Sequence, residues 1–148
     1  MSMIYARIDL DKTNYKYMEP HEWKWLTKPD PLMVKKLDEI YVKYCRYKQF
    51  KSVMPIFDSE YTDRYSDVIG YYDNEKLVAF SLIRRLAAKE YEAVQFAWDY
   101  ENPKLRLGIK SLKHECCILK SRGAKYFYLG EAQEYKKKID GFEILGPL

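Results

Sequence analysis

The chain is 148 residues long, the size of one ordinary domain, so the sequence predicts a single folding unit over residues 1–148. Hydrophobic residues make up 47% and charged residues 32% of the chain, a balance that is typical of globular proteins and excludes a disordered chain. The net charge of +4 suits a phosphate-bearing cofactor or an acidic partner, but nucleic-acid-binding proteins usually concentrate more positive charge. No apolar run approaches the roughly 20 residues that cross a bilayer, so we expect no membrane partner.

The cysteines and the N-terminus indicate a reducing compartment. Three cysteines are an odd number, and the adjacent pair Cys116 and Cys117 lacks the spacing of metal ligands, so we expect no bound metal. Residues Met1–Leu10 carry Arg7 and Asp9 and show no signal-peptide core. We therefore expect a cytoplasmic protein.

The first elements along the chain are a strand and a helix. Apolar and polar residues alternate over Ile4–Leu10, which predicts a strand, and Asp11–Lys28 is predicted to be an ordered loop. A helix is predicted to begin at Asp30-Pro31, because Asp30 can cap free N–H groups and proline suits the first helical position, and to end near Lys48. Its apolar face comprises Val34, Leu37, Tyr41, Tyr44 and Cys45, whereas lysines 35, 36 and 43 are predicted to lie in solvent.

An antiparallel meander is predicted after an irregular segment from Phe50 to Tyr65. Its strands are Asp67–Tyr72, Leu77–Leu86 and Tyr91–Tyr100, and the residues 73–76 between the first two have turn chemistry.

The remaining elements alternate between helix and strand. An amphipathic helix carries Ile109, Leu112, Cys116 and Leu119 on one face and ends at Gly123, where a left-handed residue is wanted. A strand over Lys125–Gly130, a short helix over 131–139 and a final strand over Gly141–Leu145 complete the order. A meander that crosses by a helix to another strand implies an α/β protein with a mixed sheet.

The segment from Asn102 to Lys110 joins a strand to this amphipathic helix. Such a junction exposes backbone N–H groups at the positive end of the helix dipole, and Gly108 lets the backbone approach a ligand. Lys104, Arg106 and Lys110 add positive charge. The segment is therefore either a pyrophosphate cradle or a tight turn with solvated basic residues.

These residues resemble a known superfamily. Leu105–Leu112, the helix end Lys120–Lys125 and the strand Tyr126–Gly130 look like the central block of the GNAT acyltransferases, and Tyr135–Glu143 resembles their closing Tyr…Gly-Phe segment. A closer likeness is to the C-terminal half of arginyl-tRNA–protein transferases, a GNAT branch. It is carried by Phe96–Tyr100, Pro103, Leu107-Gly108 and Tyr128-Leu129-Gly130.

The resemblance implies a GNAT-like fold with a central, mostly antiparallel sheet flanked by helices. Residues 1–65 would then form the acceptor side, and residues 66–148 the meander and the cofactor-binding portion. Tyr135 is the implied acid, and Asp99 or Glu101 is a candidate base acting through water. The candidate cofactor-binding residues are Phe96, Ala97, Trp98, Lys104, Arg106, Leu107, Gly108, Ile109 and Lys110.

Three functions stay open from the sequence. The favoured one is an N-acyltransferase that moves an acyl group, expected to be acetyl, from acyl-CoA to an amine of a small molecule or a protein. The second is an aminoacyl-tRNA-dependent transferase, with tRNA as a partner. The third is a degenerate, non-catalytic GNAT binding module, an alternative that depends on Leu105 and Lys110, which stand where the usual loop has Gln or Arg and Gly or Ala.

Overall fold

The computed structural model describes residues 4–26, 30–49, 65–99, 107–131 and 134–147. They belong to two compact units that interleave along the chain. One unit takes residues 1–18, 84–94 and 107–148, and the other takes residues 19–83 and 95–106. The single domain over residues 1–148 stays a prediction.

The strands are hydrogen-bonded in the order β2-β3-β4-β5-β6-β1-β7, a seven-stranded mixed sheet. The predicted α/β class is thereby confirmed, and so is the meander, because β3 (Ser66–Asp73), β4 (Lys76–Ala87) and β5 (Glu90–Trp98) are consecutive in this order. The predicted irregular segment 50–65 lies almost entirely outside the described residues.

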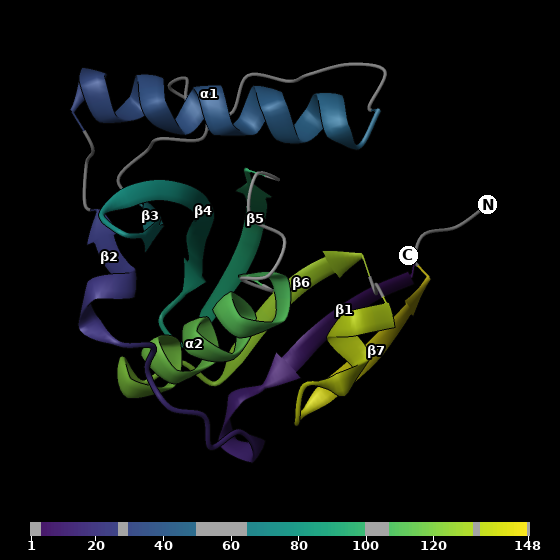
Figure 1. Cartoon of the computed structure of the whole chain (residues 1–148). Helices are drawn as coiled ribbons and strands as arrows, with labels where there is room; N and C mark the ends of the chain where they lie inside the picture. Colours follow the sequence, from purple (N-terminus) through teal and green to yellow (C-terminus); the bar gives the residue numbers. More distant parts are fainter. Residues whose placement is uncertain (1–3, 27–29, 50–64, 100–106, 132–133, 148) are drawn as a thin grey trace. The chain divides into compact units, whose positions relative to one another are not determined.

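In the first unit, β1 (Ile4–Asp9) lies between β6 (Tyr126–Glu131) and β7 (Phe142–Pro147) and is antiparallel to both (Figure 1). Its alternating pattern predicted this strand correctly, since Ala6 and Ile8 are buried. β6 runs parallel to β5, which requires the crossover that α2 (Leu107–Ser121) supplies.

Two glycines close turns in this unit. Gly123 ends α2 with a φ of 87°, and the N–H of Ala124 reaches back to the carbonyl of Leu119, as the sequence predicted. Gly141 has a φ of 78° and precedes β7, where its carbonyl accepts a hydrogen bond from the N–H of Asp9 at 2.9 Å. The helix predicted over 131–139 is a shorter 3-10 helix, η4 (Glu134–Lys138).

In the second unit, β2 (Trp23–Leu26) pairs antiparallel with β3. The prediction of an ordered loop over Asp11–Lys28 was therefore wrong for these four residues. It was also incomplete at η1 (Leu10–Lys12) and η2 (Pro20–Glu22), two 3-10 helices. The alternation in β2 is too short to stand out in a sequence, and its pairing with β3 comes from a segment more than forty residues away.

The helix α1 (Pro31–Tyr47) begins as the sequence predicted. The Asp30 carboxylate accepts a hydrogen bond from the N–H of Met33 at 2.8 Å, and Pro31 occupies the first helical position. The buried face comprises Leu37, Ile40, Tyr41 and Cys45, so the predicted stripe was nearly right but omitted Ile40.

Candidate functional site

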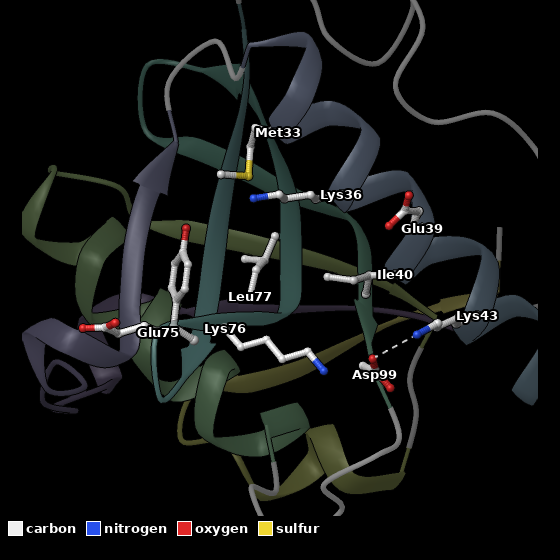
Figure 2. Close-up of a pocket in the computed structure, with 10 residues that line it drawn as sticks. Met33, Lys36, Glu39, Ile40, Lys43, Glu75, Lys76, Leu77 and Asp99 are labelled. Atoms are coloured by element: carbon white, nitrogen blue, oxygen red, sulfur yellow. Dashed lines mark hydrogen bonds and ion pairs between the residues drawn. The ribbon is translucent and has the colours of Figure 1, made fainter.

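A pocket with a volume of about 320 Å³ lies in the second unit, where α1, the β3–β4 hairpin and the end of β5 meet (Figure 2). Its lining combines apolar side chains with three ammonium groups and three carboxylates. The lining residues are Met33, Lys36, Glu39, Ile40, Lys43, Tyr72, Glu75, Lys76, Leu77 and Asp99. The volume is at the small end of the range of pockets that hold small organic molecules.

The wall formed by α1 follows from helical periodicity. Met33, Lys36, Ile40 and Lys43 are spaced by three, four and three residues, so they share one face of the helix. The sequence predicted that Lys36 and Lys43 lie in solvent, and this is confirmed, because both are exposed. Both also line the pocket, which the sequence did not predict. The signal was present in the spacing of Met33 and Ile40, two apolar residues outside the predicted apolar face.

The opposite wall is the β3–β4 hairpin. The chain turns at Asn74 and Glu75, whose φ angles are 48° and 68°, and two consecutive left-handed residues are typical of a two-residue hairpin turn. The turn predicted over residues 73–76 is confirmed. It places Tyr72 and Leu77, which flank the turn, along the apolar part of the pocket.

Asp99 lies directly after β5 and is the one candidate catalytic residue whose side chain the structure describes. Its N–H donates to the carbonyl of Val78 at 2.8 Å, which ties the residue to β4. The side chain is only 10% exposed, and its Oδ2 lies 3.5 Å from Nζ of Lys43 (Figure 2). A carboxylate that is nearly buried, held by the backbone and open to a pocket is well placed to bind or deprotonate an amine. Its catalytic role stays a prediction.

The β5 residues predicted to bind the cofactor also belong to the second unit. Ala97 is fully buried, and Phe96 and Trp98 are half-buried. The ring of Phe96 meets that of Tyr71 edge-on, with centroids 6.4 Å apart. Both packing and ligand contact are compatible with this arrangement, so the cofactor role stays a prediction.

The other predicted cofactor-binding residues lie in the first turn of α2, in the first unit. Leu107 is buried, Gly108 and Ile109 are half-buried, and Lys110 is exposed. The hydroxyl of Ser111 donates to the carbonyl of Gly108 at 3.2 Å, within the helix. The remaining predicted positions lie outside the described residues or have undescribed side chains: Glu101, Lys104, Arg106 and Tyr135.

Two potentially reactive side chains of α2, His114 and Cys116, are buried in the core. His114 is fully buried, and its Nδ1 accepts a hydrogen bond from the N–H of Met18 at 2.9 Å. Cys116 is also fully buried, and burial, followed by the neighbouring Glu115 and Cys117, raises the pKa of its thiol. A thiol that stays protonated is a poor nucleophile, so Cys116 is not a catalytic candidate.

Among the residues that the structure describes, no group of three or more His, Cys, Asp or Glu side chains is arranged to hold a metal ion. None of their helices has the length and the hydropathy that crossing a membrane requires.

Solved structures with a similar architecture show the fold of the chain. The chain is similar to L-PGS from Bacillus licheniformis, with a TM-score of 0.66 and 15% identity over 88% of this chain and 46% of that one. It is similar to a putative GNAT-family acetyltransferase from Novosphingobium aromaticivorans, with a TM-score of 0.64 and 14% identity over 97% and 60% of the two chains. It is also similar to a GCN5-related N-acetyltransferase from Kribbella flavida, with a TM-score of 0.63 and 10% identity over 99% of this chain and 55% of that one. The chain has the GNAT fold and spans about half the length of these proteins.

The family follows from the sequence itself. The family model described as "Arginine-tRNA-protein transferase, C terminus" matches residues 33–145, well over half of the chain. The chain belongs to this family, which confirms the closer resemblance seen in the sequence. No curated protein sequence matches the chain.

Proposed function

We propose that the chain is an acyltransferase that moves an aminoacyl group from an aminoacyl-tRNA to an amine. The observation that carries this proposal is the family match, because it covers residues 33–145 and names a tRNA-dependent transferase. Likeness of fold at 10–15% identity is a weaker guide to the donor than membership of a family.

The sequence from Leu105 to Lys110 supports the same choice of donor. The pyrophosphate loop of acyl-CoA-dependent GNAT proteins has the form Q/R-x-x-G-x-G/A, whereas here Leu105 and Lys110 occupy its first and last positions around Gly108. A tRNA donor does not require that signature, because its phosphates are spread along a backbone.

The chemistry needs few protein groups. The acceptor amine attacks the ester carbonyl, a C–N bond forms, the C–O ester bond breaks, and the terminal ribose hydroxyl of the tRNA leaves after gaining a proton. We assign to Asp99 the removal of the proton from the acceptor amine, because its carboxylate lines a pocket and is 10% exposed. Tyr135 is the proposed donor of the proton to the leaving ribose hydroxyl, because of its position in the Tyr…Gly-Phe segment.

A second donor is favoured by the fold. Two of the similar structures are described as acetyltransferases, and the positive N-terminal end of a helix such as α2 suits a pyrophosphate. Acetyl-CoA or another acyl-CoA is therefore the alternative donor, with the same amine attack on a thioester carbonyl and a protonated CoA thiol as the leaving group.

Transfer assays with two labelled donors separate these proposals. Radiolabelled arginyl-tRNA and acetyl-CoA would each be incubated with a mixture of free amino acids and short peptides, and the labelled amide would be measured. We expect transfer from arginyl-tRNA, at least about 100-fold slower in Asp99→Asn and unchanged in Asp38→Asn, an exposed carboxylate on α1 that does not line the pocket.

The alternative outcomes are equally definite. Transfer from acetyl-CoA alone would replace the tRNA donor by the thioester. Absence of transfer from both donors, together with no binding of acetyl-CoA at millimolar concentration by calorimetry, would leave the protein as a non-catalytic binding module.

A further inference from the structure

We propose that the pocket between α1 and the β3–β4 hairpin binds a small amphoteric amine, namely a free amino acid with an apolar side chain. This inference deepens the proposed function, on which it rests, by naming the class of acceptor. The argument starts from the balance of charges in the pocket.

The lining carries Lys36, Lys43 and Lys76 against Glu39, Glu75 and Asp99, so its formal charge is zero. A simple anion or a simple cation gains no net long-range attraction from such a lining and can pair only with the groups of the opposite sign. A molecule that carries both charges can pair with groups of both signs.

The position of the ammonium group follows from the pair formed by Lys43 and Asp99. The distance of 3.5 Å from Nζ to Oδ2 is long for a charge-assisted hydrogen bond, and the Lys43 side chain is 57% exposed. A ligand ammonium can therefore join or displace Lys43 at the Asp99 carboxylate at little cost, since the lysine returns to water.

The carboxylate of the ligand is assigned to Lys76. In Figure 2 the Lys76 side chain extends toward the side of the pocket where Asp99 lies. The two charged groups of an amino acid are attached to one carbon, which matches an ammonium and a carboxylate on the same side of the pocket. Lys36 is drawn on the other side of Leu77.

The side chain of the ligand is assigned to the apolar part of the lining, which Met33, Ile40 and Leu77 provide. Ile40 is buried, and Met33 and Leu77 are half-buried, so they offer an apolar surface next to the charged side. A volume of about 320 Å³ holds one amino acid of this kind but no bulky residue in addition. Leucine is the natural probe.

Calorimetric titration of the full chain without any donor tests the proposal with three matched probes. L-leucine carries both charges, 3-methylbutan-1-amine lacks the carboxylate, and 4-methylpentanoate lacks the amine. We expect leucine to bind at least tenfold more tightly than either analogue. Equal affinity for leucine and one of its analogues, or no binding of leucine up to 10 mM (on the order of weak metabolite affinities), would overturn the proposal.

Variants assign each charge to its partner. Lys76→Met should weaken leucine binding about tenfold and leave 3-methylbutan-1-amine unchanged, whereas Asp99→Asn should weaken both of these and leave 4-methylpentanoate unchanged. Lys35→Met is the matched control, because Lys35 is exposed on α1 and does not line the pocket. A loss of leucine binding in Lys35→Met equal to that in Lys76→Met would contradict the assignment.

The binding experiment also separates this inference from the proposed function. Leucine binding with no transfer from either donor would sustain the pocket and refute the transferase. Transfer to peptides with no leucine binding would sustain the transferase and refute the amino-acid pocket.

Discussion

At the scale of single residues, Gly141 shows how one backbone position depends on the absence of a side chain. A Cβ at this position would lie 2.3 Å from the carbonyl oxygen of Asp9, and its φ of 78° is unfavourable for any other residue. Gly123 has a similar φ of 87°, but a Cβ there would meet no atom within 4 Å. A substitution at Gly123 therefore has only the cost of the dihedral angle, whereas a substitution at Gly141 has that cost and also the cost of the contact with Asp9.

We expect Gly141→Ala to lower the free energy of unfolding by more than about 2 kcal/mol, and Gly123→Ala to lower it by about 1 kcal/mol, the cost of the dihedral alone. The reason for the difference is that the backbone must move to relieve the contact with Asp9, whose N–H also donates a hydrogen bond to the carbonyl of Gly141. Urea denaturation of both variants measures it, and equal losses would show that the turn relaxes freely.

The cysteines give a second residue-scale prediction. Cys45 and Cys116 are buried, whereas Cys117 is half-exposed, and burial raises the pKa of the Cys117 thiol despite the opposing influence of Lys120. We expect iodoacetamide to modify only Cys117 in the folded protein, with a rate that still rises at a pH where a small free thiol has levelled off, because the thiolate is the reactive form. Mass spectrometry identifies the modified residue. Modification of Cys116 at a comparable rate would contradict its burial.

At the scale of elements, the helix α1 was the most predictable part of the second unit. Its start is specified locally, because a capping carboxylate, a proline and an apolar repeat occur together between Asp30 and Cys45. The strand β2 was not predictable in the same way, since four residues that include two tryptophans also suit an ordered loop and become a strand only through pairing with β3. Local signals therefore predicted α1, and distant pairing decided β2.

We expect Asp30→Ala to lower the free energy of unfolding by about 1 kcal/mol, because the N–H of Met33 loses the carboxylate that accepts its hydrogen bond at 2.8 Å. Asp30→Ser keeps a capping oxygen and should cost less than half as much. Thermal unfolding followed by circular dichroism compares the two, and identical losses would mean that capping is not what Asp30 contributes.

At the scale of the whole molecule, the small net charge limits how a tRNA donor could bind. The chain carries 26 basic and 22 acidic residues, and no strongly one-signed composition is available to neutralise many phosphates. Each neutralised phosphate contributes roughly 0.7 to 0.9 to the slope of log affinity against log salt concentration.

We therefore expect arginyl-tRNA to bind with a slope between about −2 and −4, much shallower than that of strongly basic nucleic-acid-binding proteins. Filter binding at several salt concentrations measures this slope. A slope near zero would remove the tRNA backbone as a partner, whereas a steep slope would mean that the basic residues are concentrated on one surface.

The sequence by itself determined the class of the fold, the order of most elements and the family. The alternation in β1, the cap and stripe of α1, the hairpin turn and Gly123 are local signals, and each is encoded within a few consecutive residues. Tertiary structure decided which distant segments come together. The insertion of β1 between β6 and β7 joins segments more than one hundred residues apart. The pocket likewise depends on bringing a helix face, a hairpin and the end of β5 together, so Lys36, Lys43 and Lys76 became candidate ligands of a small molecule only in the folded unit.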